Sequence, residues 1–453
     1  MFGRILIANR GEIAVRILRT CREMDIETVA IYSESDREAL HVQLATTSIC
    51  VGESKASASY LNLQNILSAA WLTGCDAIHA GFGFLSENSE FARMCEKCGL
   101  VFIGPSGDVM DLMGNKASAR AQMIECGVPV VKGSDGIVNT AQEALKIAET
   151  IGYPILVKAS AGGGGRGMRI AQSKEELPSA FEMARAEAIS CFGDGEIYLE
   201  QLIQNPKHIE VQILADSHGN VIHLGERDCS VQRRNQKLVE EAPCATLTPE
   251  LRQKMGEDAV RAAKAVGYCN AGTIEYVLDA KGNYYFIEMN TRIQVEHPVT
   301  EMLTGLDLIE EQIRIAFGEK LRYKQEDITL QGHAIECRIN GEDPWNNFLP
   351  NAGIIEFMHL PAGKGVRVDT GLYHGYEVSP FYDSMLGKVI VHAPTREQAI
   401  AKMRRALEEL VIKGVETNRQ LSHRILFHQK FIEGSYHTGF IEAELATLLN
   451  LES

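Results

Sequence analysis

Over the first hundred residues, short apolar runs alternate with helical patterns, and this alternation limits the possible folds more than any other property of the chain. The run 5–8 precedes a segment, 11–24, in which Ile13, Ile17 and Cys21 recur every four residues and mark one apolar helix face. The alternation then continues with strand-like runs at 28–32, 77–79 and 101–103 and helical patterns at 61–72 and 90–98. Strands separated by helices in this way predict a parallel sheet covered by helices.

The pattern changes in the remainder of the chain. The runs 155–158 and 168–170 are strand-like and are joined by a glycine-dense link, which predicts a hairpin. After them the sequence predicts a helix at 175–188, strands from 197 to about 288, further strands at 354–357 and 388–391, and a helix at 396–412. A chain of 453 residues exceeds what one hydrophobic core usually supports, so we expect two to four packed units.

Composition narrows the class of protein. The 45 Lys and Arg residues against 60 Asp and Glu residues give a net charge of -15, which argues against nonspecific nucleic-acid or membrane binding. Of 11 cysteines only Cys95 and Cys98 have CxxC spacing; we interpret them as two helix cysteines, and the alternative is a redox pair. The opening segment is strand-like and no long apolar stretch follows, so we expect a cytoplasmic protein with reduced thiols and no membrane span.

The segment 160–167, Ser-Ala-Gly-Gly-Gly-Gly-Arg-Gly, is the first candidate for chemistry. Successive glycines lack Cβ atoms, so backbone N–H groups can approach phosphate oxygens closely. The glycines at 162, 164 and 167 match GxGxxG, but a strand-like run follows instead of a helix, and the Lys-Ser/Thr ending of a Walker A loop is missing. We expect a lid over phosphates with Lys158 beside it; the alternative is a surface turn.

Two glutamates form the second candidate. Glu275 and Glu288 lie on strand-like runs on either side of a turn-like segment, 279–283. A symmetric hairpin centred between Lys281 and Gly282 places the two carboxylates opposite each other, where they repel unless a cation lies between them. With Asn290 nearby, all-oxygen ligation suits Mg²⁺ or Mn²⁺. The alternative is a slipped register that turns one carboxylate to solvent.

A row of polar residues follows directly. Glu288, Asn290, Arg292, Gln294 and Glu296 recur with period two, so an extended strand would project all five to one side. A guanidinium and a terminal carboxylate in such a row can hold a small planar anion and remove its proton. The alternative is a half-exposed strand without a site.

Motifs spread over nearly the whole chain carry a family resemblance. They are Asn9-Arg-Gly-Glu-Ile-Ala14, Gly81-Phe-Gly-Phe-Leu-Ser-Glu-Asn88, 158–167, Glu226-Arg-Asp-Cys-Ser230 and 288–300. With them the chain resembles biotin carboxylase, an ATP-grasp enzyme. The resemblance implies an α/β and α+β multidomain fold, with a Rossmann-like parallel sheet in an N-terminal domain (1–113), a central ATP-grasp domain (114–330) with a glycine-rich lid at about 130–203, and a C-terminal biotin carboxylase domain (331–453).

The resemblance also implies which residues form the site. ATP would contact Lys116, Lys158, Gly164, Gly165, Glu200, Gln201, Leu202, Ile203, His208, Gln232 and Asn235. Two Mg²⁺ or Mn²⁺ ions would be held by Glu275, Glu288 and Asn290. Bicarbonate would bind Lys237, Arg292, Gln294 and Val295 beside Glu296 as general base, and biotin would meet Arg338 and Phe82.

The implied reaction runs through carboxyphosphate. Glu296 deprotonates bicarbonate, which attacks the γ-phosphoryl group of ATP while cations and the glycine loop stabilise the charge. Carboxyphosphate then yields CO₂ and phosphate, the phosphate takes the proton from biotin N1, and Arg338 stabilises the biotin enolate. Two positions depart from the family pattern: Asn235 stands where many members have histidine, and Phe82 stands where others have tyrosine.

The expected partners follow from the same resemblance. The chain has no Met-Lys-Met biotin-attachment motif, so we expect biotin on a separate carrier protein, with a carboxyltransferase as a further partner and a homodimer as the assembly. For a freestanding chain of this size, the expected role is the first half-reaction of acetyl-CoA carboxylase in fatty acid synthesis. Two alternatives remain: another ATP-grasp ligase, which would activate a different carboxylate, and a noncatalytic nucleotide sensor.

Overall fold

The computed structural model describes residues 1–160 and 167–450. Its N-terminal part is a parallel sheet with the strand order β3-β2-β1-β4-β5. The strands are β1 (Arg4–Ile7), β2 (Glu27–Ser33), β3 (Thr47–Gly52), β4 (Ala77–His79) and β5 (Val101–Phe102). The helices of this part are α1 (Gly11–Glu23), α2 (Leu40–Leu44), α3 (Leu63–Leu72), α4 (Ser89–Lys97) and α5 (Gly107–Gly114). The predicted parallel sheet is confirmed; β3 and α2 are additions that the sequence patterns did not indicate.

One antiparallel sheet joins the central and C-terminal parts of the chain. Its strand order is β13-β12-β9-β10-β11-β14-β21-β19, with the β11–β14 pair linking the two parts. The strands are β9 (Lys207–Ala215), β10 (Val221–Arg233), β11 (Gln236–Ala242), β12 (Asn270–Leu278), β13 (Tyr284–Asn290), β14 (His333–Asn340), β19 (Val366–Thr370) and β21 (Met385–Ala393). Helices of these parts are α9 (Pro249–Ala265), α10 (His297–Thr304), α11 (Leu308–Ala316), α12 (Arg396–Glu409), α13 (Arg419–Ile425), α14 (Gln429–Glu433) and α15 (Phe440–Asn450).

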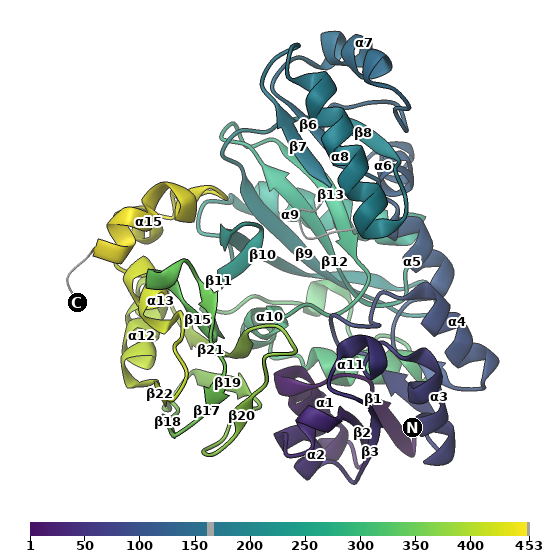
Figure 1. Ribbon diagram of the computed structural model, residues 1–453, viewed down its shortest axis with the longest axis vertical. Helices are drawn as coiled ribbons and strands as arrows, with labels where there is room; N and C mark the ends of the chain where they lie inside the picture. Colours follow the sequence, from purple (N-terminus) through teal and green to yellow (C-terminus); the bar gives the residue numbers. More distant parts are fainter. Residues whose placement is uncertain (161–166, 451–453) are drawn as a thin grey trace.

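A third sheet forms a separate lobe at the top of Figure 1. Its strands are β6 (Ile155–Ala159), β7 (Met168–Ala171) and β8 (Ile197–Gln201), in the order β7-β6-β8, and its helices are α7 (Ala141–Ile151) and α8 (Leu177–Phe192). The β6–β7 pair is antiparallel, so the predicted hairpin is confirmed. Residues such as Val157, Phe181 and Leu199 give this lobe its own apolar core. Helix α6 (Lys116–Glu125) leads into the lobe from α5.

Four predicted elements are wrong in type or extent. The stretch predicted as strands to residue 288 contains α9, whose N-cap Thr248 and first-turn Pro249 were a helix-start signal in the sequence. The predicted strand 354–357 divides into β17 (Gly353–Ile354) and β18 (Phe357–His359), which pair with β20 (Glu377–Val378) and β22 (Val411–Lys413). The last predicted helix ends at Glu409, before β22.

The remaining correction concerns the polar row. Strand β13 ends at Asn290, and residues 291–296 form bends and a turn, so the five polar residues do not share one strand face. The pair formed by β15 (Glu342–Asp343) and β16 (Leu349–Pro350) completes the sheets. Cys95 is buried and Cys98 exposed within or just after α4, and both are free thiols. In the part of the chain that the structure describes, no helix has both the length and the apolar character needed to cross a membrane.

Candidate active site

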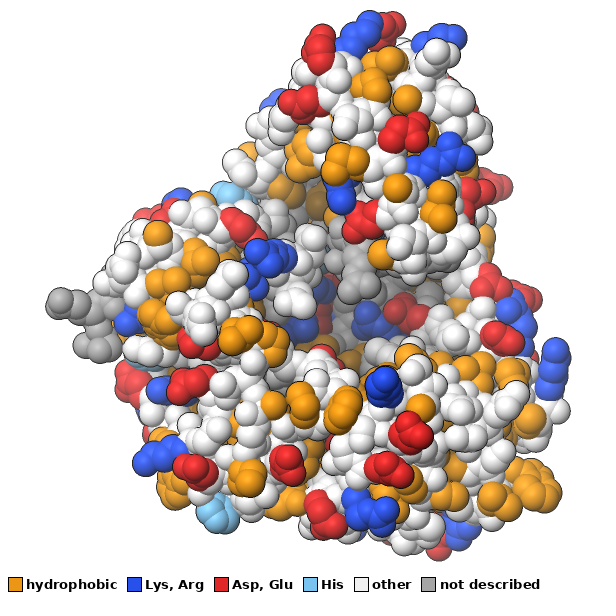
Figure 2. Space-filling model, in the orientation of Figure 1, with side chains coloured by type: hydrophobic (Ala, Val, Ile, Leu, Met, Phe, Trp, Pro, Cys, Tyr) orange, Lys and Arg blue, Asp and Glu red, His pale blue; other side chains and the backbone are white. Residues whose placement is uncertain are grey.

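The candidate residues come from elements that meet where the three parts of the molecule face one another. Figure 2 shows a hollow at this place with both basic and acidic side chains inside it. Most of the functional side chains come from strands β8 to β14 and the turn at 291–296, and Phe82, Lys116 and Lys158 come from the loop after β4, from α6 and from β6. The upper lobe lies across the hollow from the N-terminal part (Figure 1). The site therefore depends on contacts between parts that are far apart in sequence.

Lys237 lies at the centre of the site. Its ammonium nitrogen is 2.6 Å from carboxylate oxygens of Glu210 and Glu296 and 3.2 Å from Glu275. Burial alone would lower the pKa of Lys237, but the surrounding anionic groups raise it well above its ordinary value. The lysine is therefore held charged, and it neutralises a cluster of carboxylates that could not otherwise share one buried site.

The two glutamates of the hairpin lie opposite each other as predicted. Glu275 pairs with Glu288 in the β12–β13 register, and a bulge shifts the pairs nearer the turn by one residue. Glu275 is buried; one of its oxygens accepts hydrogen bonds from Asn290 and Gln294 at 2.8 Å, and the other lies 2.9 Å from His208 Nε2. Glu288 lies 3.0 Å from Lys116.

This donor set fits a hard cation. Glu275, Glu288 and Asn290 offer oxygen ligands from one end of the hairpin, as Mg²⁺ and Mn²⁺ prefer. Burial raises the pKa of Glu275, but Lys237 and His208 together lower it by a larger amount. The pKa therefore lies well below its usual range, and the carboxylate stays ionised. In the structure Lys116 and Lys237 supply positive charge beside these carboxylates, and His208 Nε2 lies 2.9 Å from Glu275.

Glu296 is held between two cations. One oxygen contacts Lys237 at 2.6 Å and the other contacts Arg338 at 3.0 Å, and the side chain is almost fully buried. Burial raises the pKa of Glu296, but Lys237, Arg338 and Arg227 lower it well below its ordinary value. The carboxylate is therefore ionised and able to accept a proton, with a basic residue on each side.

The turn that carries Glu296 is fixed by charged side chains from three directions. Arg292 lies 2.9 Å from Glu87 and donates to Asn290 Oδ1 at 3.0 Å. The fully buried Arg227 donates to Gln294 Oε1 at 2.8 Å. Lys388 Nζ donates to the carbonyl oxygen of Val295. These contacts replace the predicted strand pattern as the reason that Arg292, Gln294 and Glu296 converge.

The described candidates for the nucleotide side come from β6, β8, the connection after β8, and β9. Lys158 on β6 is 2.9 Å from Glu200 on β8, and both side chains are buried. The chain leaves β8 at Gln201 and continues through Leu202 and Ile203 as a connection to β9, which begins at Lys207. Burial lowers the pKa of His208, but the neighbouring Glu275 carboxylate raises it by a larger amount, so the pKa lies above its ordinary value. The predicted contacts Gly164 and Gly165 lie outside the described residues.

Gln232 and Asn235 lie at the β10–β11 hairpin. Gln232 pairs with Lys237 in the register and is buried. Asn235 is exposed at the tip, where Arg234 and Asn235 have φ of 49° and 64°. Two successive positive φ values are typical of a two-residue hairpin turn, and asparagine tolerates them better than most residues. Asn235 therefore has a backbone reason for its identity.

Phe82 lies beside the C-terminal part of the site. Its ring centroid is 5.9 Å from Lys388 Nζ, and its carbonyl oxygen accepts a hydrogen bond of 2.7 Å from Asn9. Arg338, on β14, is brought to Glu296 by the β11–β14 pairing and also donates to Glu240 Oε1 at 2.6 Å. All predicted catalytic and metal residues thus come together in one place.

Several residues at the site were not predicted. They are Glu87, Glu210, Arg227 and Glu240, each of which contacts a predicted residue. A signal for Glu210 was present, because His208, Glu210 and Gln212 alternate along a strand that is otherwise apolar. Polar residues on a buried strand face usually have partners or a function.

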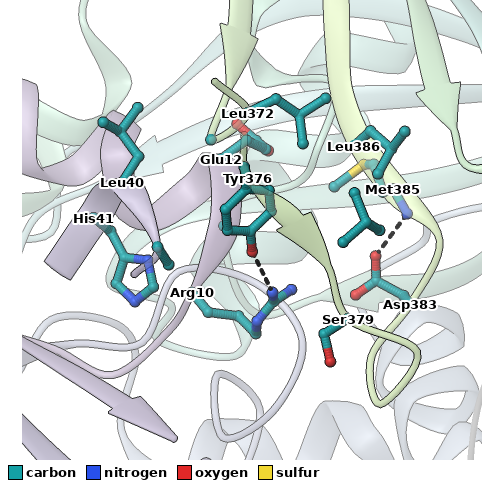
Figure 3. A pocket seen from close by; sticks show the side chains of 14 residues that line it. Arg10, Glu12, Leu40, His41, Leu372, Tyr376, Ser379, Asp383, Met385 and Leu386 are labelled. Carbon is teal, nitrogen blue, oxygen red and sulfur yellow. Dashed lines mark hydrogen bonds between the residues drawn. The ribbon is translucent and has the colours of Figure 1, made fainter. Parts of the chain in front are cut away.

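A small cavity of about 30 Å³ lies elsewhere, between the N-terminal and C-terminal parts. Figure 3 shows Arg10 and Tyr376 in it, joined by a 3.4 Å hydrogen bond from the guanidinium to the phenol oxygen. Leu372, Met385 and Leu386 supply apolar lining, and none of the predicted site residues lines it. The cavity is far too small for a nucleotide and belongs to the packing between the two parts.

Three family models match successive parts of the chain. Residues 1–110 match the biotin carboxylase N-terminal domain, residues 115–324 match the ATP-binding domain of the carbamoyl-phosphate synthase L chain, and residues 336–443 match the biotin carboxylase C-terminal domain. The three matches follow the order of the three parts of the fold and agree with the predicted fold class.

Individual relatives match along nearly their whole length. Biotin carboxylase 1 of Bacillus subtilis is 54% identical over 443 residues, which cover 98% of each chain. A pyruvate carboxylase chain of Methanothermobacter thermautotrophicus is 51% identical over 98% of this chain and 90% of that one. The biotin carboxylase domain dimer of Hydrogenobacter thermophilus 2-oxoglutarate carboxylase, crystallised with MgADP, ADP and bicarbonate, has a TM-score of 0.96 and 53% identity, with 100% of both chains covered.

Proposed function

This chain belongs to the biotin carboxylase family, and we propose that its ATP-dependent carboxylation of biotin with bicarbonate is the first half-reaction of acetyl-CoA carboxylase in fatty acid synthesis. The observation that carries the enzymatic part is Glu296, an ionised, buried carboxylate held between Lys237 and Arg338 beside the Glu275–Glu288 pair. This arrangement joins a proton acceptor to a cation site and an anion site. A noncatalytic nucleotide sensor would not require a proton acceptor next to a cation site and an anion site.

ATP and its metal ions are assigned to the edge of the hollow. Lys116, Lys158, Gly164 and Gly165 would contact the phosphates, and the connection from Glu200 through Gln201, Leu202 and Ile203, with His208, Gln232 and Asn235, would complete the nucleotide site. Glu275, Glu288 and Asn290 would hold Mg²⁺ or Mn²⁺, which neutralises charge on the phosphates during phosphoryl transfer. Lys116 lies 3.0 Å from Glu288, so it would contact phosphates held by a metal ion at that carboxylate.

Bicarbonate is assigned to the space between Lys237, Arg292, Gln294 and the Val295 backbone. Their donors suit a planar anion, and Glu296 adjoins them as the proton acceptor. The low pKa of Glu296 keeps it ionised before each turnover. When the Glu296 carboxylate takes the bicarbonate proton, a bicarbonate oxygen attacks the γ-phosphorus of ATP, the bond from that phosphorus to the bridging oxygen breaks, and carboxyphosphate and ADP form, while Lys237 stabilises the developing charge.

Biotin is assigned to Arg338 and Phe82. Carboxyphosphate breaks down to CO₂ and phosphate, and phosphate takes the N1 proton of biotin. Arg338 then lies at the negative oxygen of the biotin enolate as it attacks CO₂, and the aromatic face of Phe82 packs against the ring system. Closure of the upper lobe over the site would keep water from carboxyphosphate.

We assign the partners by similarity. A biotin carrier protein brings biotin to the hollow, and a carboxyltransferase receives the carboxyl group. A homodimer is proposed because the 2-oxoglutarate carboxylase relative crystallised as a dimer. The cytoplasm is the expected location. The pyruvate and 2-oxoglutarate carboxylase relatives support a second candidate role, in which the acceptor is a 2-oxo acid.

The first experiment measures ADP release with Mg-ATP in the presence of bicarbonate, free biotin or both, for the wild type and Glu296→Ala. Turnover that needs bicarbonate, rises with biotin and disappears in the variant supports the proposed reaction and base. Turnover at a rate that depends on neither bicarbonate nor biotin indicates another ATP-grasp ligase. Nucleotide binding without turnover for any carboxylate tested indicates a sensor.

The acceptor needs a separate experiment. Carrier proteins from an acetyl-CoA carboxylase and from a pyruvate carboxylase are offered in biotinylated form, and the rate of carboxybiotin formation on each is compared with that on free biotin. A preference of tenfold or more for the acetyl-CoA carboxylase carrier supports the proposal. The opposite preference supports the 2-oxo acid role.

A further inference from the structure

Two fully buried glutamates lie directly behind the site, and the proposed reaction does not use either. Glu240 on β11 and Glu336 on β14 are paired in the antiparallel register, and both are 0% exposed. Directly opposed residues on paired strands project to the same face, with Cβ atoms about 5 Å apart. Two carboxylates in that relation repel unless a proton or a cation separates them.

The hydrogen bonds around the pair are incomplete. Arg338 donates to Glu240 Oε1 at 2.6 Å, but among the described residues no donor reaches the other oxygen of Glu240 or either oxygen of Glu336. Among the described residues, no group of three or more close His, Cys, Asp or Glu ligands includes either glutamate. Arg338 neutralises Glu240, whereas no described residue donates to either oxygen of Glu336. A retained proton allows Glu336 to stay buried beside it, since a protonated carboxyl loses its charge and gains a donor.

Charged groups from every neighbouring element face this pair. Arg338 shares β14 with Glu336, Lys237 shares β11 with Glu240, and Lys388 projects from β21 opposite Arg338. Glu296 approaches from the preceding turn, and His297 lies at the start of α10, which packs on the same face. Burial raises the pKa of Glu336 well above its usual value despite Lys388, and burial raises that of Glu240 to about 7 despite Arg338.

Arg338 is therefore bound by two carboxylates of different kinds. Glu296, 3.0 Å away, accepts the bicarbonate proton in the proposed reaction and loses its charge at that step. Glu240, 2.6 Å away, lies behind the guanidinium and out of reach of substrate. An arginine released by Glu296 thus keeps one ionic partner, which fixes its orientation when the biotin enolate forms.

We propose that Glu240 is a positioning residue that anchors Arg338 for the biotin step, and that Glu336 opposite it stays protonated so that the pair carries at most one negative charge. The role rests on the proposed function, since it concerns the half of the reaction that follows carboxyphosphate formation. It predicts that the two glutamates, although paired, respond differently to the same substitution.

The test compares Glu240→Gln, Glu336→Gln and Glu241→Gln in the full-length protein. Glu241 is the matched control, because it is the next residue of β11, projects to the other face and binds Arg396 and His333 instead. For each variant, kcat for ADP release is measured with bicarbonate alone and with bicarbonate plus biotin. Infrared spectra at pH 8 record the carbonyl band of a protonated carboxylic acid.

The expected results separate the roles. Glu240→Gln lowers the biotin-dependent rate at least tenfold more than the bicarbonate-only rate, and Glu240→Asp recovers part of the loss because it restores the charge. Glu336→Gln changes the ratio of the two rates less than twofold and removes the protonated-acid band. Glu241→Gln lowers the stability and leaves the ratio unchanged.

Three results would overturn the proposal: a wild-type ratio in Glu240→Gln, an equal loss in Glu336→Gln, or an infrared band that Glu336→Gln does not affect. If Glu240→Gln does not fold, the ratio of the two rates in Glu240→Asp and the infrared band in Glu336→Gln still test the two roles. A wild type that biotin does not stimulate would refute the proposed function, and the infrared band would then report on the carboxyl pair alone.

Discussion

At the scale of single residues, the site is organised by buried guanidinium groups that fix polar partners. Arg227 has no exposed surface and donates to Gln212, Thr273, Thr300 and Gln294 as well as to Glu210. Its planar set of donors satisfies groups on β9, β12, α10 and the turn at 291–296 at once. A lysine provides the charge without this geometry.

We therefore expect Arg227→Lys to raise the KM for bicarbonate about tenfold, equivalent to about 1.4 kcal/mol, because Gln294 loses its fixed orientation. The measurement is bicarbonate-dependent ADP release at saturating Mg-ATP. Arg252→Lys is the matched control, since Arg252 binds Glu226 at 2.8 Å away from the predicted anion site. An unchanged KM in Arg227→Lys would contradict the orienting role.

A second prediction concerns Phe82. Phe82→Tyr should change the KM for biotin less than tenfold, or about 1.4 kcal/mol, because the aromatic face that packs against biotin is retained. The added hydroxyl would lie on a ring whose centroid is 5.9 Å from Lys388 Nζ. Phe82→Leu is the comparison that removes the aromatic face, and a larger effect of the tyrosine than of the leucine would refute the packing account.

At the scale of elements, short connections and strand neighbours determine where side chains point. The β10–β11 hairpin returns through Arg234 and Asn235 only, so that Lys237 lies opposite Gln232 in the register. The same strand β11 places Glu240 toward the site and Glu241 toward the C-terminal helices. One strand thus supports both the chemistry and the attachment of a neighbouring layer.

The turn gives a prediction for Asn235. Asn235→Ala should lower the free energy of unfolding by about 1 kcal/mol, because alanine resists the positive φ, whereas Asn235→Gly should be nearly neutral. Urea denaturation of both variants measures the difference. Because Asn235 is assigned to the nucleotide site, the KM for ATP should rise by a similar factor in both variants; an unchanged KM in both would show that the side chain has only the backbone role.

Glu241 gives a prediction for pH dependence. Burial raises its pKa, but His333 and Arg396 lower it to about 2, against an ordinary value of 4.5. Because the pKa of Glu241 is lower in the folded protein than in the unfolded chain, its ionised carboxylate stabilises the fold above about pH 5. This contribution of about 3 kcal/mol is lost as the pH falls from about 5 toward 2. Glu241→Gln should therefore unfold more easily at pH 7 and show a shallower loss of stability on acidification, measured by urea denaturation.

At the scale of the whole molecule, the upper lobe has a core of its own and meets the rest across the hollow (Figure 1). Near the proposed metal site Lys116 of α6 lies 3.0 Å from Glu288, while Met123 and Val128 join the same stretch of chain to the apolar core that contains Phe286 and Met289 of β13. A bound nucleotide would contact both sides of the hollow, so ligand binding and the position of the lobe are coupled through the same residues.

Mg-ATP should therefore stabilise the protein. At 100 times its Kd the free energy of unfolding should rise by about 2.7 kcal/mol, because only the folded state binds. Thermal unfolding with Mg-ATP, with ATP plus EDTA, and without nucleotide measures the effect. The gain should fall with EDTA and in Glu288→Gln, and persist in the surface control Glu310→Gln; a gain that is independent of metal would refute the assigned ligands.

Most of the local structure and the residue types of the site can be predicted from the amino-acid sequence. The alternation of apolar runs predicted the parallel sheet, and the symmetric spacing about residues 281 and 282 predicted that Glu275 and Glu288 lie opposite each other. Helix α9, which packs on β9 and β10, was missed although its N-cap Thr248 and first-turn Pro249 were visible, because the whole stretch from 197 to about 288 was interpreted as strands. Local patterns suffice where neighbours in sequence are also neighbours in space.

The convergence of the active residues, in contrast, depends on contacts between distant parts of the fold. The polar row 288–296 was predicted as one strand face, yet the chain leaves the strand after Asn290, and Arg227, Glu87 and Lys388 bring the side chains together. These partners lie on distant elements, so no periodicity within the row could reveal them. The same holds for Glu240 and Glu336, which come to lie opposite each other only when β11 pairs with β14. The free energy of a buried charge depends on its spatial neighbours, and here distant parts of the chain supply them, so only the tertiary structure decides it.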